Sequence, residues 1–278
     1  MPRSTLPPLP PRPNDGHKGT FGRVLIVGGS AAMAGAPILC GRAALRMGSG
    51  LVQLAVGDLA HTASIAACPE LIGLPGAPDL RAIRDAAKNA DAVAIGPGWG
   101  TSPGNRRILL ALLELEVTLV IDSDALNLLA KEKRWPATKG NTILTPHPGE
   151  MKRLADNYKL GTFDAAGDEQ RAAIAKKLAT LTGGVVVLKG SRTVIADATH
   201  LQVNTTGDSS LSKAGTGDVL TGVIASLVGQ GMNAFDAAVL GTHVHGLAGE
   251  IAGKRLGQRS VLASDVVETL STAIGKLR

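Results

Sequence analysis

The fold is decided by the stretch Asn204-Thr-Thr-Gly-Asp-Ser-Ser-Leu-Ser-Lys-Ala-Gly-Thr-Gly-Asp218, which runs directly into the apolar segment Val219-Leu-Thr-Gly-Val-Ile224. Gly215 and Gly217 allow the backbone to turn where a side chain would clash, so the first N–H groups of the following helix point toward one spot. A helix start of this kind attracts negative charge. Asp218 places a carboxylate beside that anion site, although a Gly-Asp pair before a helix can also be a simple N-cap.

Working outward from this stretch, short β-branched runs alternate with Ala- and Leu-rich stretches of helical length. This alternation is typical of βαβ units, in which helices cover both faces of a central, mostly parallel sheet. We expect strands at Val24–Val27, Leu51–Val56, Ala92–Ile95, Thr118–Ile121, Thr142–Leu144, Val185–Leu188, Thr193–Ala196 and Leu201–Val203. We expect helices at Ala36–Met47, Leu80–Lys88, Asn105–Leu113, Ala125–Ala130, Gly149–Ala155, Asp164–Thr182, Asp218–Gly229, Ala234–Ala252 and Ser264–Ile274.

One edge of this sheet is predicted to be antiparallel, because only Lys189-Gly-Ser-Arg192 separates two of the expected strands, a gap of hairpin size. Residues 1–20 are rich in proline, which is unfavourable in helices and central strands, and we expect them to form an extended arm. No composition break or internal repeat divides the remainder. Residues 21–278 are therefore predicted to form a single domain.

The candidate functional motifs all follow predicted strands, and ligands of open α/β sheets gather beyond the carboxyl ends of the strands. They are Gly28-Gly-Ser30, Gly96-Pro-Gly-Trp-Gly100, Asp122-Ser-Asp124, Thr145-Pro-His-Pro-Gly-Glu150 and Lys189-Gly-Ser-Arg-Thr193. The glycines of the second motif leave backbone amides free to face a phosphate or a sugar. The lysine and arginine of the last suit a nucleotide phosphate or ribose, with a solvated hairpin as the alternative.

Two of these motifs keep more than one interpretation. Asp122-Ser-Asp124 is compatible with a helix N-cap and, equally, with a polar role near a metal or nucleotide. His147 lies between two prolines that stiffen its loop, which favours a contact with the substrate over a merely exposed histidine. Glu150 is interpreted as a favourable first-turn charge rather than as a catalyst.

A metal site is not expected among the later histidines, because the i, i+4 histidine spacing of a helical metal site is missing from His243, His245 and Glu250. We favour close helix packing there.

Composition excludes several classes of protein. The chain of 278 residues has a net charge of +6, but its basic residues are scattered along the sequence. It has only two Trp, one Tyr and three Phe that could stack on bases. These features argue against nucleic-acid binding and favour an anionic small molecule as the ligand. Two cysteines far apart in the sequence predict neither a zinc site nor a disulfide and fit a reducing cytoplasm. With no leader-like segment and no run of roughly 18 apolar residues, we expect a cytoplasmic protein without a membrane span.

Taken together, the motifs resemble those of the ADP- or ATP-dependent NAD(P)H-hydrate dehydratases, a family with the ribokinase-like fold. The resemblance follows the family's order from about residue 17 to 255. It rests on His17-Lys-Gly-Thr-Phe-Gly22, Gly28-Gly-Ser30, Met33-Ala-Gly-Ala36, Gly48-Ser-Gly-Leu-Val52, Gly96-Pro-Gly-Trp-Gly100, Asp122-Ser-Asp-Ala-Leu-Asn127, Thr145-Pro-His-Pro-Gly-Glu150, Lys189-Gly190, Gly215-Thr-Gly-Asp-Val-Leu-Thr-Gly222 and His245-Gly-Leu-Ala-Gly249.

The resemblance implies a role for particular residues. The family's contacts to the hydrated dinucleotide fall on Ala36, Gly98, His147 and Asp218, and its contacts to the adenine nucleotide fall on Lys189, Gly190, Ser191, Arg192, Thr193 and Gly217. Asp218 would be the general base, and the amides of Gly215, Thr216 and Gly217 would form an anion hole.

The resemblance also implies ligands and assembly. These are ADP or ATP as co-substrate, Mg²⁺ with unknown ligands, hydrated NADH or NADPH as substrate, and a homotetramer. Larger family members carry an additional epimerase domain, which we expect to be absent here.

Two other functions remain open at this stage. The first is a small-molecule kinase of the same fold that acts on a vitamin precursor, since such kinases share the anion loop and the base; Thr145–Glu150 and Gly96–Gly100 resemble the dehydratases instead. The second is a non-catalytic dinucleotide-binding protein, which would have no need for a base at Asp218. The first glycine loop does not match G-x-G-x-x-G, which disfavours a Rossmann oxidoreductase.

Overall fold

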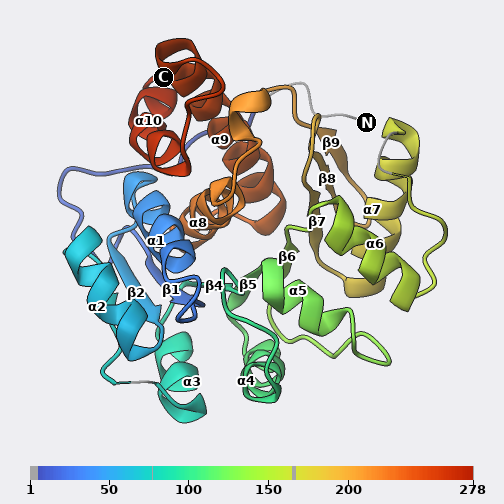
Figure 1. The fold of residues 1–278 in the computed structure, drawn as a ribbon, viewed down its shortest axis with the longest axis horizontal. Helices are drawn as coiled ribbons and strands as arrows, with labels where there is room; N and C mark the ends of the chain where they lie inside the picture. Colours follow the sequence, from blue (N-terminus) through green and yellow to red (C-terminus); the bar gives the residue numbers. More distant parts are fainter. Residues whose placement is uncertain (1–5, 77, 165–166, 278) are drawn as a thin grey trace.

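The computed structural model describes residues 6–76, 78–164 and 167–277, which form a three-layer α/β structure (Figure 1). Within these residues nine strands form one sheet in the order β3-β2-β1-β4-β5-β6-β7-β8-β9. The strands are β1 (Arg23–Val27), β2 (Leu51–Ala55), β3 (Ile72–Gly73), β4 (Ala92–Ile95), β5 (Thr118–Ile121), β6 (Thr142–Leu144), β7 (Val185–Leu188), β8 (Val194–Ala196) and β9 (Leu201–Val203). Strands β1 to β7 pair in parallel, whereas β8 and β9 pair antiparallel and complete one edge. The predicted mixed sheet is confirmed.

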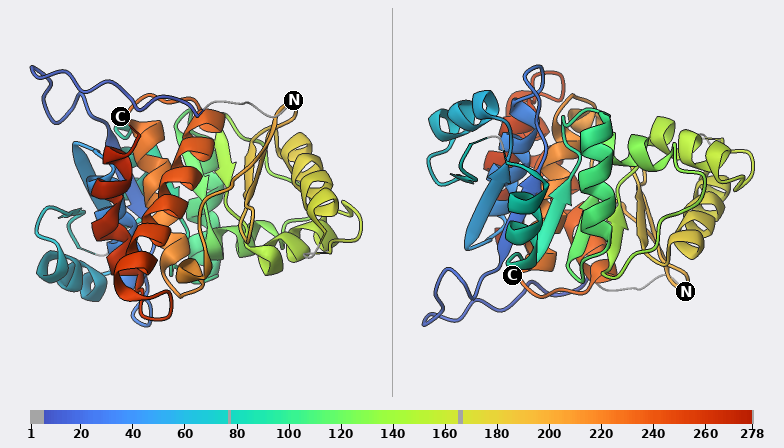
Figure 2. Two further views of the ribbon diagram at one scale, coloured as in Figure 1. Left: turned by 90° about the horizontal axis from the view of Figure 1, so that it is seen from above. Right: turned by 90° about the horizontal axis from the view of Figure 1, so that it is seen from below.

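Two apolar layers hold the helices against the sheet. Side chains alternate along each strand, so Val24 and Ile26 face one layer while Leu25 and Val27 face the other. Helices α1, α8, α9 and α10 cover the first face and α3 to α7 the second (Figures 1 and 2). The helices are α1 (Gly35–Arg46), α2 (Asp58–Ala67), α3 (Leu80–Lys88), α4 (Pro103–Leu113), α5 (Ser123–Leu129), α6 (Pro148–Asn157), α7 (Asp168–Thr182), the 3₁₀ turn η1 (Ser209–Leu211), α8 (Thr216–Gly229), α9 (Ala234–Leu256) and α10 (Ala263–Gly275).

Helix α8 is the central helix of the first layer, and its apolar sequence explains why. Every residue from Val219 to Gly229 is buried. Gly222 lets α8 approach α1 closely, since a Cβ there would lie 2.0 Å from the carbonyl oxygen of Cys40. Helix α8 is therefore fixed between the sheet, α1 and α9, and its N-terminus has a defined position relative to the strand ends.

Several boundaries differ from the prediction. Helix α7 begins at Asp168, after Gly167, rather than at Asp164; residues 165–166 of the predicted helix lie outside the described part. Helix α4 begins two residues early because the Ser102 hydroxyl accepts from the amide of Asn105 and Pro103 occupies the first turn. Helix α2 and the two-residue strand β3 were not predicted, since neither carries a clear periodic pattern.

The proline-rich arm contains turns but no helix or strand over residues 6–20. Leu9 packs against the helix-side core, and a later part of the arm projects as a loop (Figure 2). Residues 1–5 of the predicted arm lie outside the described part. None of the helices that the structure describes is both long and apolar enough to cross a membrane.

Candidate active site

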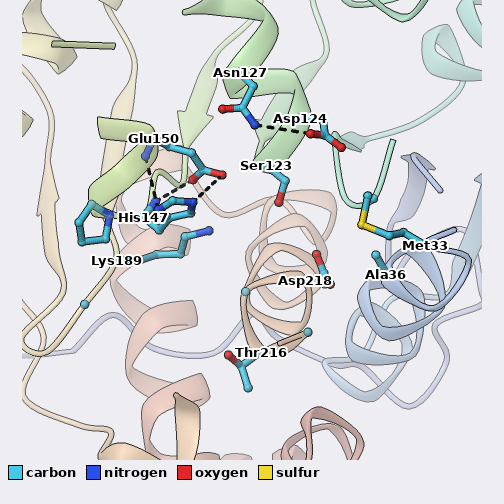
Figure 3. A pocket seen from close by; sticks show the side chains of 15 residues that line it. Met33, Ala36, Ser123, Asp124, Asn127, His147, Glu150, Lys189, Thr216 and Asp218 are labelled. Carbon is cyan, nitrogen blue, oxygen red and sulfur yellow. Dashed lines mark hydrogen bonds and ion pairs between the residues drawn. The ribbon is translucent and has the colours of Figure 1, made fainter. Parts of the chain in front are cut away.

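The site forms where the carboxyl ends of the parallel strands face the N-terminus of α8 (Figure 3). Gly215 precedes that helix with a φ of +90°, a left-handed conformation that glycine adopts without strain. The Thr216 hydroxyl fixes the loop by donating to the carbonyl oxygens of Leu211 (2.8 Å) and Lys213 (2.9 Å). A Cβ at residue 217 would lie 3.3 Å from Nζ of Lys189, so glycine there leaves the helix start open beside an ammonium group.

Asp218 stands in the first turn of α8, with its side chain in the same space. Burial raises the pKa of Asp218 to about 7, and the nearby carboxylates of Asp122 and Glu150 act in the same direction, while Lys189 opposes them. A carboxyl with such a pKa is partly ionised at neutral pH and still basic enough to accept a proton efficiently. The arrangement therefore places a carboxyl that can accept a proton near neutral pH beside the first amides of α8.

Asp122 is the buried charge on which the site is built. It is fully buried after β5 and makes no side-chain cap bond to α5. Its Oδ1 lies 2.7 Å from Nζ of Lys189 and accepts from the Thr145 hydroxyl at 2.8 Å, while Oδ2 accepts from the Thr221 hydroxyl at 2.9 Å. Burial alone would raise the pKa of Asp122, but the ammonium and the hydroxyls outweigh it and hold that pKa below its usual range.

The Asp122–Lys189 pair joins the strand ends to α8. Asp122 follows β5, Thr145 follows β6, Lys189 follows β7, and Thr221 lies one turn inside α8. The buried ion pair therefore ties Lys189, and with it the anion site, to a fixed point of the sheet. Asp122 occupies the N-cap position of α5 without a side-chain cap bond and pairs with Lys189 instead, while a role near a metal or nucleotide stays a prediction.

His147 and Glu150 form a capping box at the start of α6. Nδ1 of His147 accepts from the amide of Gly149 at 2.9 Å, and the Glu150 carboxylate accepts from the amide of His147 at 2.8 Å. Nε2 of His147 lies 3.3 Å from the other oxygen of Glu150 (Figure 3). His147 therefore caps a helix as well as lining the pocket, a structural role that the sequence argument did not include.

Glu150 is also more than a first-turn charge. Burial raises the pKa of this carboxyl to about 7, with Asp122 adding to the effect and Lys189 opposing it. Its side chain is nearly buried and faces the same pocket as Asp218.

The glycine loop after β4 forms the opposite wall. Gly98 has a φ of +60°, and a Cβ there would come within 2.9 Å of Ala36, so these two residues narrow the pocket together. The loop is held by Asp124, which accepts from the amide of Gly100 at 2.7 Å, and by Asn105, which donates to the carbonyl oxygen of Trp99 at 2.8 Å. These hydrogen bonds hold the backbone of the loop after β4 in place, and this backbone forms the pocket wall.

Two hollows adjoin at this site. The first, the Asp218 pocket, has a volume of about 500 Å³ and is lined by Met33, Ala36, Gly98, Ser123, Asp124, Asn127, His147, Pro148, Glu150, Lys189, Gly190, Gly215, Thr216, Gly217 and Asp218. The second, the hairpin pocket, has a volume of about 420 Å³ and is lined by residues 189–193 together with Asn204, Thr206, Gly207, Asp208, Ser209, Leu211, Ser212, Thr216, Gly217, Leu220, Thr242, His245 and Gly246. Both contain Lys189, Gly190, Thr216 and Gly217, so the start of α8 lies on their common boundary.

The predicted site residues divide between these hollows. Those assigned to the hydrated dinucleotide all line the Asp218 pocket, and those assigned to the adenine nucleotide all line the hairpin pocket. Their individual roles stay predictions. Sequence reasoning named Asp122-Ser-Asp124 as a candidate motif without assigning it to a ligand, and Ser123 and Asp124 line the Asp218 pocket. It assigned no role to Asn127, which also lines that pocket and follows the motif by one helical turn.

The hairpin between β7 and β8 is held in place by Arg171 of α7. Its guanidinium donates to the carbonyl oxygen of Ser191 at 2.6 Å and to that of Leu188 at 3.4 Å. Arg192, at the tip with a φ of +56°, lies 3.0 Å from Asp168. The turn is consequently held in a defined shape, although Gly190, Ser191 and Arg192 are exposed to solvent, and its contact with a nucleotide stays a prediction.

The histidines of α9 have structural surroundings. Glu250 accepts from the amide of Gly207 at 2.7 Å, and the carbonyl oxygen of His243 accepts from the Thr206 hydroxyl at 2.8 Å. Burial lowers the pKa of His245 to about 4, so its ring is neutral at physiological pH. These contacts hold the loop that lines the hairpin pocket.

A mostly parallel sheet with an antiparallel edge, and an amide-lined helix start with a carboxylate beside it, define a ribokinase-like enzyme. The family model for NAD(P)H-hydrate dehydratases matches residues 24–272. The chain belongs to the NAD(P)H-hydrate dehydratase family. This membership does not fit the vitamin-precursor kinase or the non-catalytic binding protein.

Relatives and solved structures agree with this assignment. The chain is 39% identical to an ADP-dependent (S)-NAD(P)H-hydrate dehydratase of Neisseria meningitidis, covering 88% of this chain and 82% of the relative. It is 41% identical to a bifunctional NAD(P)H-hydrate repair enzyme of Moorella thermoacetica, covering 97% of this chain and 52% of that protein. The chain thus spans about half the length of the bifunctional relatives it matches. A crystal structure of the Bacillus subtilis ADP/ATP-dependent NAD(P)H-hydrate dehydratase, co-crystallised with ATP and Mg²⁺, superposes with a TM-score of 0.84 at 29% identity, covering 97% and 95% of the two chains.

Proposed function

We propose that this protein catalyses the ADP-dependent dehydration of (6S)-NAD(P)H hydrate to NAD(P)H, with release of AMP and phosphate. The observation that carries the proposal is the pair of hollows that meet at the N-terminus of α8, with Asp218 in one of them. In this proposal the Asp218 pocket binds the hydroxylated ring, the hairpin pocket binds the nucleotide, and the transferred phosphoryl group lies at their common boundary.

The proposed reaction begins with proton transfer to Asp218. Its carboxylate takes the proton of the ring hydroxyl, and the oxygen forms a bond to the terminal phosphorus of ADP as the bond from that phosphorus to AMP breaks. Hydroxide is a poor leaving group, whereas phosphate is a good one. The C–O bond then breaks, phosphate carries the hydroxyl oxygen away, and a proton leaves the adjacent ring carbon to restore the double bond.

The chain's own groups stabilise the charge that develops in this step. The amides of Gly215, Thr216 and Gly217 are proposed to bind the phosphoryl oxygens, and Lys189 adds a fixed ammonium group at the boundary of the two hollows. Burial would lower the pKa of Lys189, but Asp122 and Glu150 raise it above the usual value, so the group stays protonated. Residues 189–193 are proposed to hold the rest of the nucleotide.

We also propose Mg²⁺ as the ion that accompanies the nucleotide. Among the described residues no group of three His, Cys, Asp or Glu side chains is placed to hold a metal. Mg²⁺ commonly uses one or two carboxylates together with substrate phosphates and water, and Glu150 places a carboxylate in the pocket. When bound, the ion supplies neutralisation of phosphate charge.

The remaining expectations are part of the proposal. We propose ADP as the preferred phosphoryl donor, supported by the relative whose name specifies ADP dependence. We propose a homotetramer in the cytoplasm on the basis of the family resemblance, and light scattering on the purified protein would measure its mass. Hydrated NADH and hydrated NADPH are both proposed substrates.

The activity can be tested with purified protein, chemically hydrated NADH and Mg²⁺, to which ADP or ATP is added while the absorbance of the dihydronicotinamide ring is followed. Recovery of absorbance that requires a nucleotide supports the proposal, and the rates with the two nucleotides identify the donor. No recovery with either nucleotide contradicts it.

A further inference from the structure

A third hollow adjoins the Asp218 pocket on the side away from the nucleotide. It has a volume of about 620 Å³ and lies between α5, α6 and the loop after β4. We call it the Arg153 hollow; it is lined by Thr101, Asn127, Ala130, Lys131, Arg153 and Asp156. Asn127 lines both this hollow and the Asp218 pocket.

The three hollows therefore follow one another along the protein. The hairpin pocket joins the Asp218 pocket at Thr216, and the Arg153 hollow joins it at Asn127. Figure 3 shows Thr216 and Asn127 at opposite sides of the pocket. When a nucleotide occupies the hairpin pocket, a long substrate whose reactive ring lies at Asp218 can extend past Asn127 into the third hollow.

The lining of the Arg153 hollow has two basic side chains, Lys131 and Arg153, and one acidic side chain, Asp156. Glu150, outside this lining, also interacts electrostatically with Arg153. Nε of Arg153 donates to the amide oxygen of Asn127 at 2.9 Å, so a neutral partner orients the guanidinium. Asp156, the acidic residue of the lining, lies 2.8 Å from Lys152 outside it. Within the part of the chain that the structure describes, neither Arg153 nor Lys131 takes part in an ion pair.

An oriented guanidinium with a lysine beside it suits phosphate, because the planar guanidinium donates to two phosphate oxygens at once. A dinucleotide carries such groups at some distance from its nicotinamide ring: a diphosphate in every case, and a further phosphate on the ribose of NADPH. We propose that Arg153 and Lys131 bind the phosphate groups of the hydrated dinucleotide in the Arg153 hollow. This inference rests on the proposed function.

The test replaces Arg153 by glutamine, which removes the charge and keeps a donor for Asn127. Losing a charged hydrogen bond of this kind should raise the KM for the hydrate on the order of tenfold, while kcat and the KM for ADP stay near the wild-type values. Lys131→Gln should act in the same direction. Arg81→Gln is the matched control, since Arg81 lies on the exposed face of α3 and lines none of the three hollows.

The two sources of phosphate are separated by comparing substrates. An equal loss with NADH hydrate and NADPH hydrate places the diphosphate in the hollow, and a loss confined to NADPH hydrate places the ribose phosphate there. Binding of the products NADH and NADPH, followed by their fluorescence, gives a second readout that needs no turnover. An Arg153→Gln enzyme with unchanged KM and unchanged product affinity overturns the inference. Absence of activity in the wild type refutes the proposed function instead, and the fluorescence titration still tests the hollow.

Discussion

Replacing Asp218 with asparagine should slow turnover and, at the same time, stabilise the fold at alkaline pH. Both effects follow from the same surroundings. The carboxyl lies partly buried near Asp122 and Glu150, and these surroundings raise its pKa from 3.8 to about 7. Asparagine has nearly the same shape but accepts no proton and carries no charge.

The catalytic loss can be sized from the role of a general base, which contributes on the order of 10² to 10⁴ in rate. We therefore expect kcat of the Asp218→Asn enzyme to fall at least about a hundredfold. In the wild type only the ionised base is active, so activity should rise with pH through about 7, with roughly a tenth of the maximal rate at pH 6. Glu150→Gln should retain this rise, whereas Asp218→Asn should abolish it.

The gain in stability of the Asp218→Asn variant can be calculated from the shifted pKa of Asp218. A folded-state pKa raised above the unfolded value favours the protonated form, so this contribution to stability is present below pH 3.8 and is lost as the pH rises through about 7. The full difference corresponds to roughly 4 kcal/mol. Allowing for water at the open side of the pocket, we expect the variant to gain about 2 to 4 kcal/mol over the wild type at pH 8.

The assay combines kinetics with urea unfolding of both proteins from pH 4 to pH 8. The stability advantage of the variant should grow across this range and level off above pH 7. Near-normal turnover in Asp218→Asn would refute the catalytic assignment. A variant that is less stable than the wild type at pH 8 would refute the electrostatic reasoning.

Three further predictions follow from the same structure. His147→Asn should preserve the free energy of unfolding because asparagine is a good N-cap, whereas His147→Ala should lower it by about 1 kcal/mol. Both substitutions should raise the KM for the hydrate. An unchanged KM in both variants would show that His147 does not contact the substrate. Lys189→Met should lower the free energy of unfolding in urea by roughly 3–5 kcal/mol, because Asp122 stays buried without its partner. Adding Asp122→Asn should restore part of that free energy. A Lys189→Met protein as stable as the wild type would contradict the importance of this pair. Chelation of divalent cations should abolish nucleotide-dependent recovery of NADH and added Mg²⁺ should restore it, whereas full activity under chelation would exclude a metal requirement.

The central strands could be predicted from the sequence because they are short apolar runs, and β4, β6 and β7 are buried along their whole length. Such runs stand out between helical stretches. The antiparallel edge followed from the four-residue gap between β7 and β8. Helix α2 and β3 could not be predicted, since α2 has a weak apolar pattern and β3 comprises two residues at the edge.

The site was predictable where backbone chemistry leaves a sequence signature. Gly215 and Gly217 mark a turn that other residues would strain or block, and Asp218 follows them directly. The pairing of Asp122 with Lys189 was not predictable, because 67 residues separate them and only the adjacency of β5, β6 and β7 brings them together. The capping role of His147 was missed for a different reason, since histidine is an uncommon N-cap and its ring nitrogen substitutes here for the usual side-chain oxygen.

The central claim, that the ring hydroxyl attacks the terminal phosphoryl group of the nucleotide, can be tested by following the hydroxyl oxygen. NADH hydrate carrying oxygen-18 in its ring hydroxyl would be converted by the enzyme with unlabelled ADP, and the phosphate and water analysed by mass spectrometry. The account predicts one labelled oxygen in each phosphate released and none in AMP. Label released as water, with unlabelled phosphate, would contradict it.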